Sequence, residues 1–376
     1  MNVETFLHNS LINSRDFFSC DYTSARLKFL SAVENLKLPH SKQSWHLNSE
    51  LCCDTVWIGP SNANNLLVMI SGTHGVEGYC GSAVQSFIVE GVINGFFKIP
   101  DDCAILLIHA LNPWGMHYYR RCDQEGIDLN RNFIDFNQTL IENSEFTNYL
   151  EQLASVESSV RFEKFKQLAN EVGQQLFDEQ FSGGQYHCNW GPFYGGQQPS
   201  WSNQVIESII KEYKLSDKLL VVLDVHSGLG PFGFGELISD HTPDTAGFEF
   251  AEKLFGPAAA QTLLGDSFSV TKRGLLDYRW HKLMQKQGCF LTLEFGSYGT
   301  AALFKVILDD HIAWRGEKGV SKEELNLQAQ KMLQHFCPEQ HMWQQAVLFK
   351  SWQVVEQIFV AFSENSDYSE FQNGKS

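Results

Sequence analysis

The segment LLVMISGTHGVEG, residues 66–78, joins an apolar run of strand length to a turn flanked by glycines. The residues that follow it place Val84, Phe87, Ile88 and Val92 at helical spacing. Near-continuous apolar runs are typical of strands that helices cover on both faces. Similar runs occur at residues 55–58, 104–110, 219–225 and 289–295, with helical patterns between them. This alternation predicts an α/β layered fold.

Helical spacing also predicts helices over residues 203–213, 245–255, 278–286, 301–315, 322–335 and 342–362. The stretch 136–201 interrupts the alternation, because it holds two helical patterns, 138–153 and 160–177, and then a loop rich in glycine and aromatic residues. We interpret this stretch as an insertion that caps the sheet. No linker or repeat divides the chain, so residues 1–376 are predicted to form one domain with a polar tail at 363–376.

The chain of 376 residues has 28 Lys and Arg against 44 Asp and Glu, which gives a net charge of −16. Without a basic cluster, this balance argues against binding to nucleic acid or to an anionic membrane. No apolar run approaches the roughly 18 residues that cross a bilayer. The N-terminal segment lacks the pattern of a secretory signal, and the 9 cysteines include no CxxC pair. We therefore expect a cytoplasmic protein with reduced thiols, whose oligomeric state the sequence leaves open.

Polar side chains follow the apolar runs, at the edge where parallel strands end and ligands bind. His74 and Glu77 follow the run 66–70, and His226 follows the run 219–225. Catalytic zinc sites commonly use two histidines and one carboxylate and leave the fourth position to water. An isolated His74 and Glu77 pair fits a solvated or helix-capping role, but the addition of His226 favours a zinc site.

Two acids lie close to these candidate ligands in the predicted sheet. Asp224 precedes His226 by two residues, and either a structural hydrogen bond or the orientation of a ligand accounts for it. Glu294 closes the last run at the same sheet edge, where it could take a proton from a metal-bound water and return it to a leaving amine. Capping of a helix or pairing with an arginine is the structural alternative for Glu294.

The loop 118–133 is rich in arginine for so acidic a chain, because Arg120, Arg121 and Arg131 fall within it. Guanidinium groups bind carboxylates with two parallel hydrogen bonds and stabilise an oxyanion. Both abilities suit a site that cleaves an amide beside a metal. On composition alone, a surface network of ion pairs is the favoured interpretation of these arginines.

Five segments occur in order at the predicted strand ends, namely GTHGVEG at 72–78, NPWG at 112–115, GIDLNRNF at 126–133, DVHSG at 224–228 and LEFGS at 293–297. Together they resemble the zinc carboxypeptidases and their succinylglutamate desuccinylase and aspartoacylase relatives, and most of all the bacterial DUF2817 branch. The resemblance covers residues 72–300, and no matching motif occurs before residue 51 or after residue 319. It implies a mixed, mostly parallel central sheet with helices on both faces.

The resemblance also implies roles for individual residues. His74, Glu77 and His226 would bind zinc, and Glu294 would act as the general base and acid. Asp128 would accept a hydrogen bond from His74 and thereby fix the tautomer and the orientation of its ring.

Further residues are implied to hold the substrate. Asn130 and Arg131 would bind the substrate's carboxylate, and an upstream arginine would polarise the scissile carbonyl. We prefer Arg121 for this catalytic role. Arg120 stays a candidate for substrate binding, because the sequence does not separate the two neighbours.

The implied activity is zinc-dependent hydrolysis of an amide next to a free carboxylate, as in metallocarboxypeptidases that act on small peptides. Deacylation of a small N-acyl amino acid is the alternative, and a large cap closing over the site would favour it. A metal-binding protein without turnover is a third interpretation, against which Glu294 argues. The aromatic loop near residues 183–196 is expected either to move over the pocket or to pack as an ordinary loop.

Overall fold

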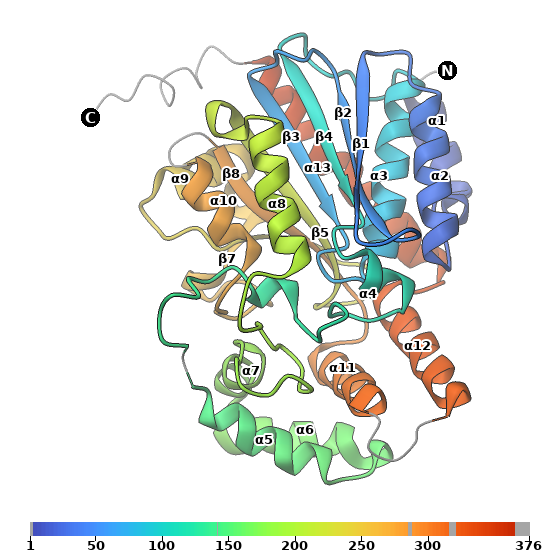
Figure 1. Cartoon of the computed structure of the whole chain (residues 1–376). Coiled ribbons are helices and arrows are strands. Elements are labelled where there is room, and N and C mark those ends of the chain that lie inside the picture. Colours follow the sequence, from blue (N-terminus) through green and yellow to red (C-terminus); the bar gives the residue numbers. More distant parts are fainter. Residues whose placement is uncertain (1–2, 141, 285–287, 316–320, 365–376) are drawn as a thin grey trace.

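A single mixed β-sheet forms the centre of the computed structural model, which describes residues 3–140, 142–284, 288–315 and 321–364 (Figure 1). The described strands follow the order β1-β2-β4-β3-β5-β8-β6-β7. The pairs β3–β4, β3–β5, β5–β8 and β6–β7 are parallel, and the other neighbours are antiparallel. The strands are β1 (His40–His46), β2 (Cys52–Ile58), β3 (Asn65–Ser71), β4 (Cys103–His109), β5 (Leu219–Gly228), β6 (Gly235–Ser239), β7 (Ala259–Gln261) and β8 (Gly288–Gly296).

Helices cover both faces of this sheet, as predicted (Figure 1). The side chains of β3 alternate between two cores, because Leu67 and Met69 pack into one cluster while Leu66, Val68 and Ile70 pack into the other. The α-helices are α1 (Val3–Ile12), α2 (Tyr22–Glu34), α3 (Gly78–Ile93), α4 (Pro113–His117), α5 (Ser144–Ala154), α6 (Ser158–Val172), α7 (Gln174–Ser182), α8 (Trp201–Glu212), α9 (Ala246–Phe255), α10 (Leu276–Met284), α11 (Thr300–Arg315), α12 (Lys322–Phe336) and α13 (His341–Ser363).

Short 3₁₀ helices complete the described elements: η1 (Ser14–Asp16), η2 (Leu129–Arg131), η3 (Leu215–Asp217), η4 (Gly256–Ala258) and η5 (Thr262–Leu264). The larger core cluster contains residues of α3, α11, α12 and α13, and the smaller one contains residues of α8 and α10. Every residue of β2, β3, β4 and β5 is buried. This burial explains why these strands have continuous apolar sequences rather than alternating ones.

The structure also contains elements that apolar runs do not reveal. Strand β1 has the polar sequence HSKQSWH and forms an exposed edge of the sheet, so it needs no apolar run. Strands β6 and β7 and helices α1 and α2 were likewise not predicted. The helix predicted over residues 160–177 is wrong in its length, because Gly173 takes a φ of 96° and separates α6 from α7.

Helices α5, α6 and α7 lie together with α11 beyond one end of the sheet (Figure 1). Helices α5, α6 and α7 belong to the stretch that we predicted as an inserted cap, whereas α11 does not. Their aromatic side chains pack on Phe304 of α11, with ring centroids of Phe181 and Phe304 5.1 Å apart. Residues 365–376 of the predicted polar tail and residues 285–286 of a predicted helix lie outside the described residues.

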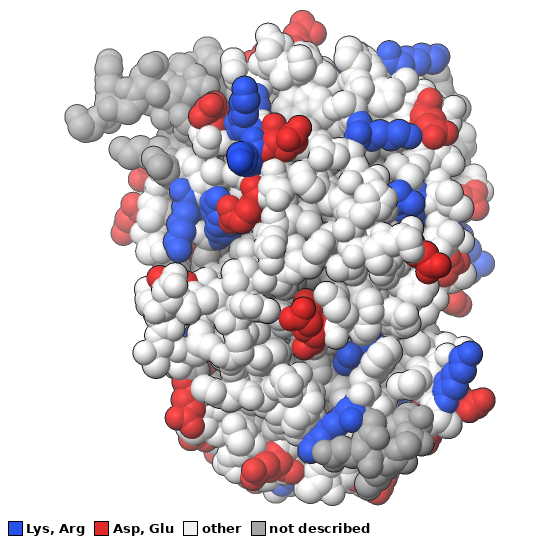
Figure 2. Space-filling model, viewed as in Figure 1, with Lys and Arg blue, Asp and Glu red and all other residues white. Residues whose placement is uncertain are grey.

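Two surface properties bear on possible partners. No helix in the described part of the chain combines the length and apolar character needed to cross a membrane. On the face shown in Figure 2, Lys and Arg side chains are scattered among acidic ones and form no continuous basic patch.

Candidate metal centre

The turn after β3 places His74 and Glu77 at the carboxyl end of the sheet. Gly72 begins this turn with a φ of 72°, and Glu77 is the residue that precedes α3. Gly75 is required for close packing, because a Cβ atom there would lie 2.1 Å from the backbone carbon of Gly115. The small residues of this turn therefore position both candidate ligands against the neighbouring NPWG segment.

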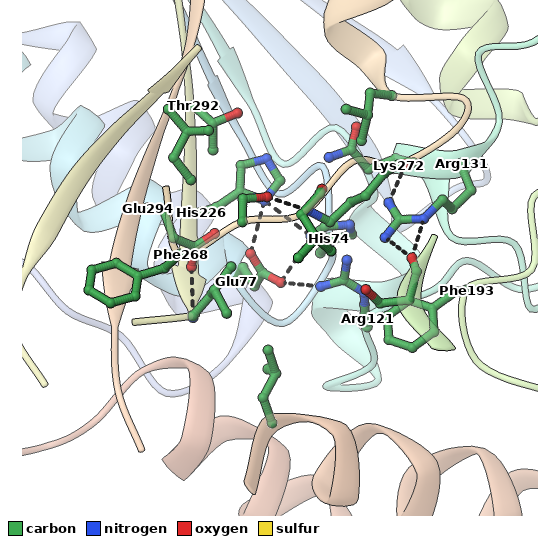
Figure 3. A pocket seen from close by; sticks show the side chains of 18 of the residues that line it. His74, Glu77, Arg121, Arg131, Phe193, His226, Phe268, Lys272, Thr292 and Glu294 are labelled. Carbon is green, nitrogen blue, oxygen red and sulfur yellow. Dashed lines mark hydrogen bonds and ion pairs between the residues drawn. The ribbon is translucent and has the colours of Figure 1, made fainter. Parts of the chain in front are cut away.

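His226 approaches these two residues from the end of the adjacent parallel strand β5. Its Nδ1 atom lies 3.1 Å from Nδ1 of His74 and 3.0 Å from Oε2 of Glu77. Nδ1 of His74 lies 2.9 Å from Oε1 of Glu77. All three side chains are buried, and Figure 3 shows them pointing toward one another. The structure thus brings together the three residues that the sequence proposed as metal ligands.

The Nε2 atom of each histidine lies within hydrogen-bond distance of a carboxylate. Nε2 of His74 lies 3.0 Å from Oδ1 of Asp128, and Nε2 of His226 lies 2.6 Å from Oδ2 of Asp224. A carboxylate accepts hydrogen bonds, so the proton of each neutral imidazole is on Nε2 and the lone pair is on Nδ1. Asp224, for which two roles remained open, therefore contacts the ring of His226 in the manner of an orienting residue.

In the neutral form, Nδ1 of each histidine offers a lone pair to the point where the two rings meet the carboxylate of Glu77. Two histidines with one carboxylate are a common donor set for catalytic zinc. Bonds of about 2.05 Å in a tetrahedral site would separate the ligand atoms by about 3.3 Å. The two Nδ1 atoms are 3.1 Å apart, which is close to this value, and each of them lies 2.9–3.0 Å from a different oxygen of the Glu77 carboxylate. The three residues therefore fit a zinc ion.

The charge state of Glu77 agrees with this interpretation. Burial alone would raise the pKa of Glu77, but His74, His226 and Arg121 lower it to below its ordinary value. The buried carboxylate is therefore ionised, as a metal ligand has to be.

Glu294 lies beside the three ligands on strand β8. It is the register partner of His226 in the parallel pairing of β5 with β8, and its Oε1 accepts a hydrogen bond from the backbone N–H of Leu229 at 3.0 Å. Burial, followed by the charge of Glu77, raises the pKa of Glu294 to about 8. A carboxyl group with such a pKa can both accept and donate a proton near neutral pH.

The two neighbouring arginines lie in different places. Arg121 lines the pocket, where its Nη1 donates to Oε1 of Glu77 at 2.8 Å and its Nε donates to Oδ2 of Asp128 at 3.0 Å. Arg120 points away from this pocket and donates to Oδ2 of Asp310 at 2.8 Å, with its guanidinium over the ring of Trp314. Of the two, only Arg121 is placed to meet a bound substrate.

Asn130 and Arg131 also line the pocket. The backbone N–H of Leu276 donates to Oδ1 of Asn130 at 2.8 Å, which leaves the Nδ2 group as the available donor. Arg131 is buried and donates from Nε and Nη2 to the carbonyl oxygen of Ser182, at 3.1 and 2.7 Å. It also donates from Nη1 to the carbonyl oxygen of Asn130. Arg131 therefore connects the cap to the centre while two of its five N–H groups stay available.

The aromatic loop of the cap forms part of the pocket wall. Phe193 is buried and lies against both guanidinium groups, with its ring centroid 5.7 Å from Cζ of Arg121 and 5.5 Å from Cζ of Arg131. Its φ of 59° is rare for a residue other than glycine. This tight packing favours the packed loop over the moving cover among the two alternatives.

Sequence reasoning missed a group of pocket residues that are distant from the five motifs. Thr292 and Phe290 line the pocket together with Glu294, because alternate residues of a strand face the same side. This spacing of two was available in the sequence. Asp178, Asp240, Lys272 and Asp277 also line the pocket, and no motif marks them.

The fold and this centre define an α/β chain with two histidines and two glutamates gathered at the carboxyl edge of its sheet. The family model described as "Protein of unknown function (DUF2817)" matches residues 18–350. The chain therefore belongs to this family. A comparison with curated proteins finds no match.

Solved structures of enzymes resemble the chain at low sequence identity. Carboxypeptidase A from Helicoverpa armigera is 12% identical, with a TM-score of 0.50, over 92% of this chain and 74% of that one. Succinylglutamate desuccinylase from Chromobacterium violaceum is 13% identical, with a TM-score of 0.36, over 74% and 76%. The first likeness supports the carboxypeptidase-like fold, and the second score is too low to carry an argument.

Proposed function

We propose that the protein is a zinc-dependent hydrolase that cleaves an amide bond next to a free carboxylate, as a carboxypeptidase does. The observation that carries this proposal is the convergence of His74, Glu77 and His226 beside Glu294 in one pocket. A site that only stored a metal would need the three ligands but no further acid beside them. Zinc bound at such a site lowers the pKa of a bound water and polarises a carbonyl oxygen.

The remaining chemistry belongs to side chains of the protein. Glu294 accepts a proton from the attacking water and returns it to the leaving amine, for which its pKa of about 8 is suited. Asp128 and Asp224 keep both ligand imidazoles in the required tautomer. Arg121 supplies positive charge to the carbonyl oxygen that becomes negative in the transition state.

Substrate orientation is the task that we propose for Asn130 and Arg131. The Nδ2 group of Asn130 and the available N–H groups of Arg131 are donors suited to a carboxylate. Phe193 restricts both arginines by lying against their guanidinium groups. Substrates without the carboxylate are expected to react slowly, because they would not be held near the zinc.

One observation favours a second candidate function, the deacylation of a small N-acyl amino acid. Ser182, Phe193 and Phe304 line the pocket from the cap and α11, so the cap restricts the space above the centre. A restricted pocket suits a small substrate better than a long peptide.

The proposal is tested with purified protein whose metal content has been measured. Turnover of benzoylated dipeptides is compared with turnover of N-acyl amino acids that carry the same C-terminal residue. Hydrolysis of the dipeptides supports the carboxypeptidase-type function, and hydrolysis of the N-acyl amino acids alone supports the deacylase. Absence of both activities from zinc-loaded protein would contradict the hydrolase function.

A further inference from the structure

The pocket contains a second charged region, separate from the metal centre. Asp178, Asp240, Lys272 and Asp277 line it from α7, from the residue after β6, from a loop and from α10, respectively. We call these four residues the acidic wall. The proposed mechanism uses none of them, so their presence in the pocket needs another explanation.

Strand β8 extends from the metal centre toward the acidic wall. Glu294, Thr292 and Phe290 occupy alternate positions of β8 and all line the pocket. Ile238 of β6 is the register partner of Thr292, and Asp240 follows Ile238 by two residues. Two residues of a strand span about 7 Å. Asp240 is four strand positions from the level of Glu294, or about 14 Å along the sheet. The wall therefore lies further along the sheet than the general base, on the side where the side chain of a substrate would lie.

Asp277 is the member of the wall that most clearly lacks a partner. The residue is 3% exposed, and its Oδ1 atom is buried without a hydrogen-bond partner among the described residues. Burial, followed by the nearby charge of Asp240, raises the pKa of Asp277 well above its ordinary value. A buried carboxyl oxygen without a donor is destabilising, so a ligand that supplies a donor would be favoured.

Lys272 forms no direct ion pair with the wall carboxylates among the described residues. Its Nζ donates to Oγ of Ser269 and, at 2.9 Å, to the carbonyl oxygen of Val270, both in its own loop. Burial, followed by the charge of Arg131, lowers the pKa of Lys272 to about 8. Figure 3 shows Lys272 and Arg131 on the same side of the pocket. Three carboxyl groups of the pocket therefore face one amine, two of whose three N–H groups already donate to its own loop.

We propose that Asp277 and Asp240 bind the positively charged end of a substrate side chain, a primary amine or a guanidinium. This inference rests on the proposed hydrolase function, because it assigns the side chain of the residue that carries the free carboxylate. The substrate would place this carboxylate at Asn130 and Arg131 and extend its cationic side chain along Thr292 to the wall. The cation then supplies the donor that Oδ1 of Asp277 lacks.

The test compares lysine with norleucine, which has the same linear chain without the amine. Values of kcat/KM are measured for benzoyl-glycyl-lysine and benzoyl-glycyl-norleucine, and for N-acetyl-lysine and N-acetyl-norleucine. We expect the lysine substrate to be preferred by at least about tenfold in whichever series is hydrolysed, since norleucine leaves the buried carboxyl unpaired. Equal rates, or a preference for norleucine, would overturn the inference.

Variants of the wall connect this preference to specific residues. Asp277→Asn is expected to reduce the preference for lysine to below about threefold, and Asp240→Asn serves the same purpose if the first variant does not fold. The matched control is Asp101→Asn, which removes an exposed aspartate far along the chain from the wall residues and should retain the preference. A preference that survives in both wall variants would contradict the assignment.

A binding measurement separates this inference from the proposed function. Free L-lysine and L-norleucine are titrated calorimetrically into zinc-loaded Glu294→Gln protein, which needs no turnover. Binding of lysine that is at least about tenfold tighter than binding of norleucine supports a cation site at the acidic wall. If no substrate is hydrolysed as well, the cation site stands and only the hydrolase function is contradicted. Equal affinities would reject the wall while leaving hydrolysis of other substrates unaffected.

Discussion

Glu294 on β8 and His226 on β5 are register partners in the parallel sheet, so the proposed base and one proposed metal ligand stand side by side on neighbouring strands. Backbone pairing fixes this relationship, and the N–H of Leu229 holds the carboxyl group of Glu294. The rigid sheet thereby places the acid next to the centre before any substrate arrives. Such preorganisation is what a proton-transfer site requires.

The variant Glu294→Gln separates catalysis from metal binding. We expect its turnover to fall by about 10²–10⁴-fold, because the amide cannot accept the proton of the attacking water. The zinc content should stay the same, since Glu294 is not among the three ligand residues. Metal analysis and kinetics on the same preparation check this prediction, and full activity of the variant would show that another group is the base.

The variants Asp128→Asn and Asp224→Asn address the orientation of the ligand rings. Each removes a carboxylate that holds Nε2 of a proposed ligand histidine. We expect zinc affinity to decrease by about 10–100-fold in each variant. Competition with a chelator measures the affinity, and Asp101→Asn is the charge-matched control. Unchanged affinity in both variants would mean that the carboxylates do not tune the ligands.

The variant Gly75→Ala tests the turn that carries His74 and Glu77. The new methyl group would lie 2.1 Å from the backbone of Gly115, so the turn has to shift. We expect loss of zinc binding together with a lower melting temperature. Gly95→Ala is the control for backbone strain without a clash, because its φ of 69° strains alanine while no atom lies within 4 Å of the corresponding Cβ. It should lower the melting temperature but keep zinc binding. Zinc binding by Gly75→Ala protein with wild-type affinity would contradict this account of the turn.

Stability should decrease in acid because several histidines are buried in the neutral form. The rings of His241 and His281 stack at 3.7 Å, and burial lowers their pKa values to about 4 and about 3. Below pH 6.5 the unfolded chain binds protons that the folded chain does not, so the free energy of unfolding falls by up to about 1.4 kcal/mol per pH unit per histidine. This loss continues until the folded pKa is reached.

The variant His281→Phe keeps a ring in the stack but cannot be protonated. Its melting temperature should therefore fall less than that of the wild type between pH 7 and pH 4.5, as scanning calorimetry would show. Other buried histidines, such as His335, leave part of the decrease in place. An identical pH dependence in both proteins would exclude the stacked pair as a cause.

The sequence predicted the central strands and the grouping of His74, Glu77 and His226, because both leave strong local signals. Fully buried strands require unbroken apolar runs, and the ends of β3, β5 and β8 carry the functional groups directly after such runs. Strand β1 left no such signal, since an exposed edge strand tolerates polar residues. Its pairing with β2 depends on backbone hydrogen bonds that any sequence can make.

The rest of the pocket could not be predicted for a different reason. Asp240 and Asp277 are remote from the motifs, and only the pairing of β6 with β8 and the position of α10 bring them to the pocket. Arg120 and Arg121 are neighbours in sequence, but their side chains diverge, one to Asp310 and the other to Glu77. Their separation depends on tertiary packing, which neither spacing nor composition records.

The contact between Arg131 and Ser182 limits how the protein could admit a substrate or lose its insertion. The guanidinium has almost no exposure, and its acceptor at Ser182 belongs to the insertion. Moving the insertion outward would break both hydrogen bonds to Ser182 and leave the guanidinium without these acceptors. We therefore expect substrates to enter the pocket without an outward movement of the insertion. A homologue that lacks the insertion would also lack the acceptor at Ser182, so we expect it to carry a different residue in place of Arg131.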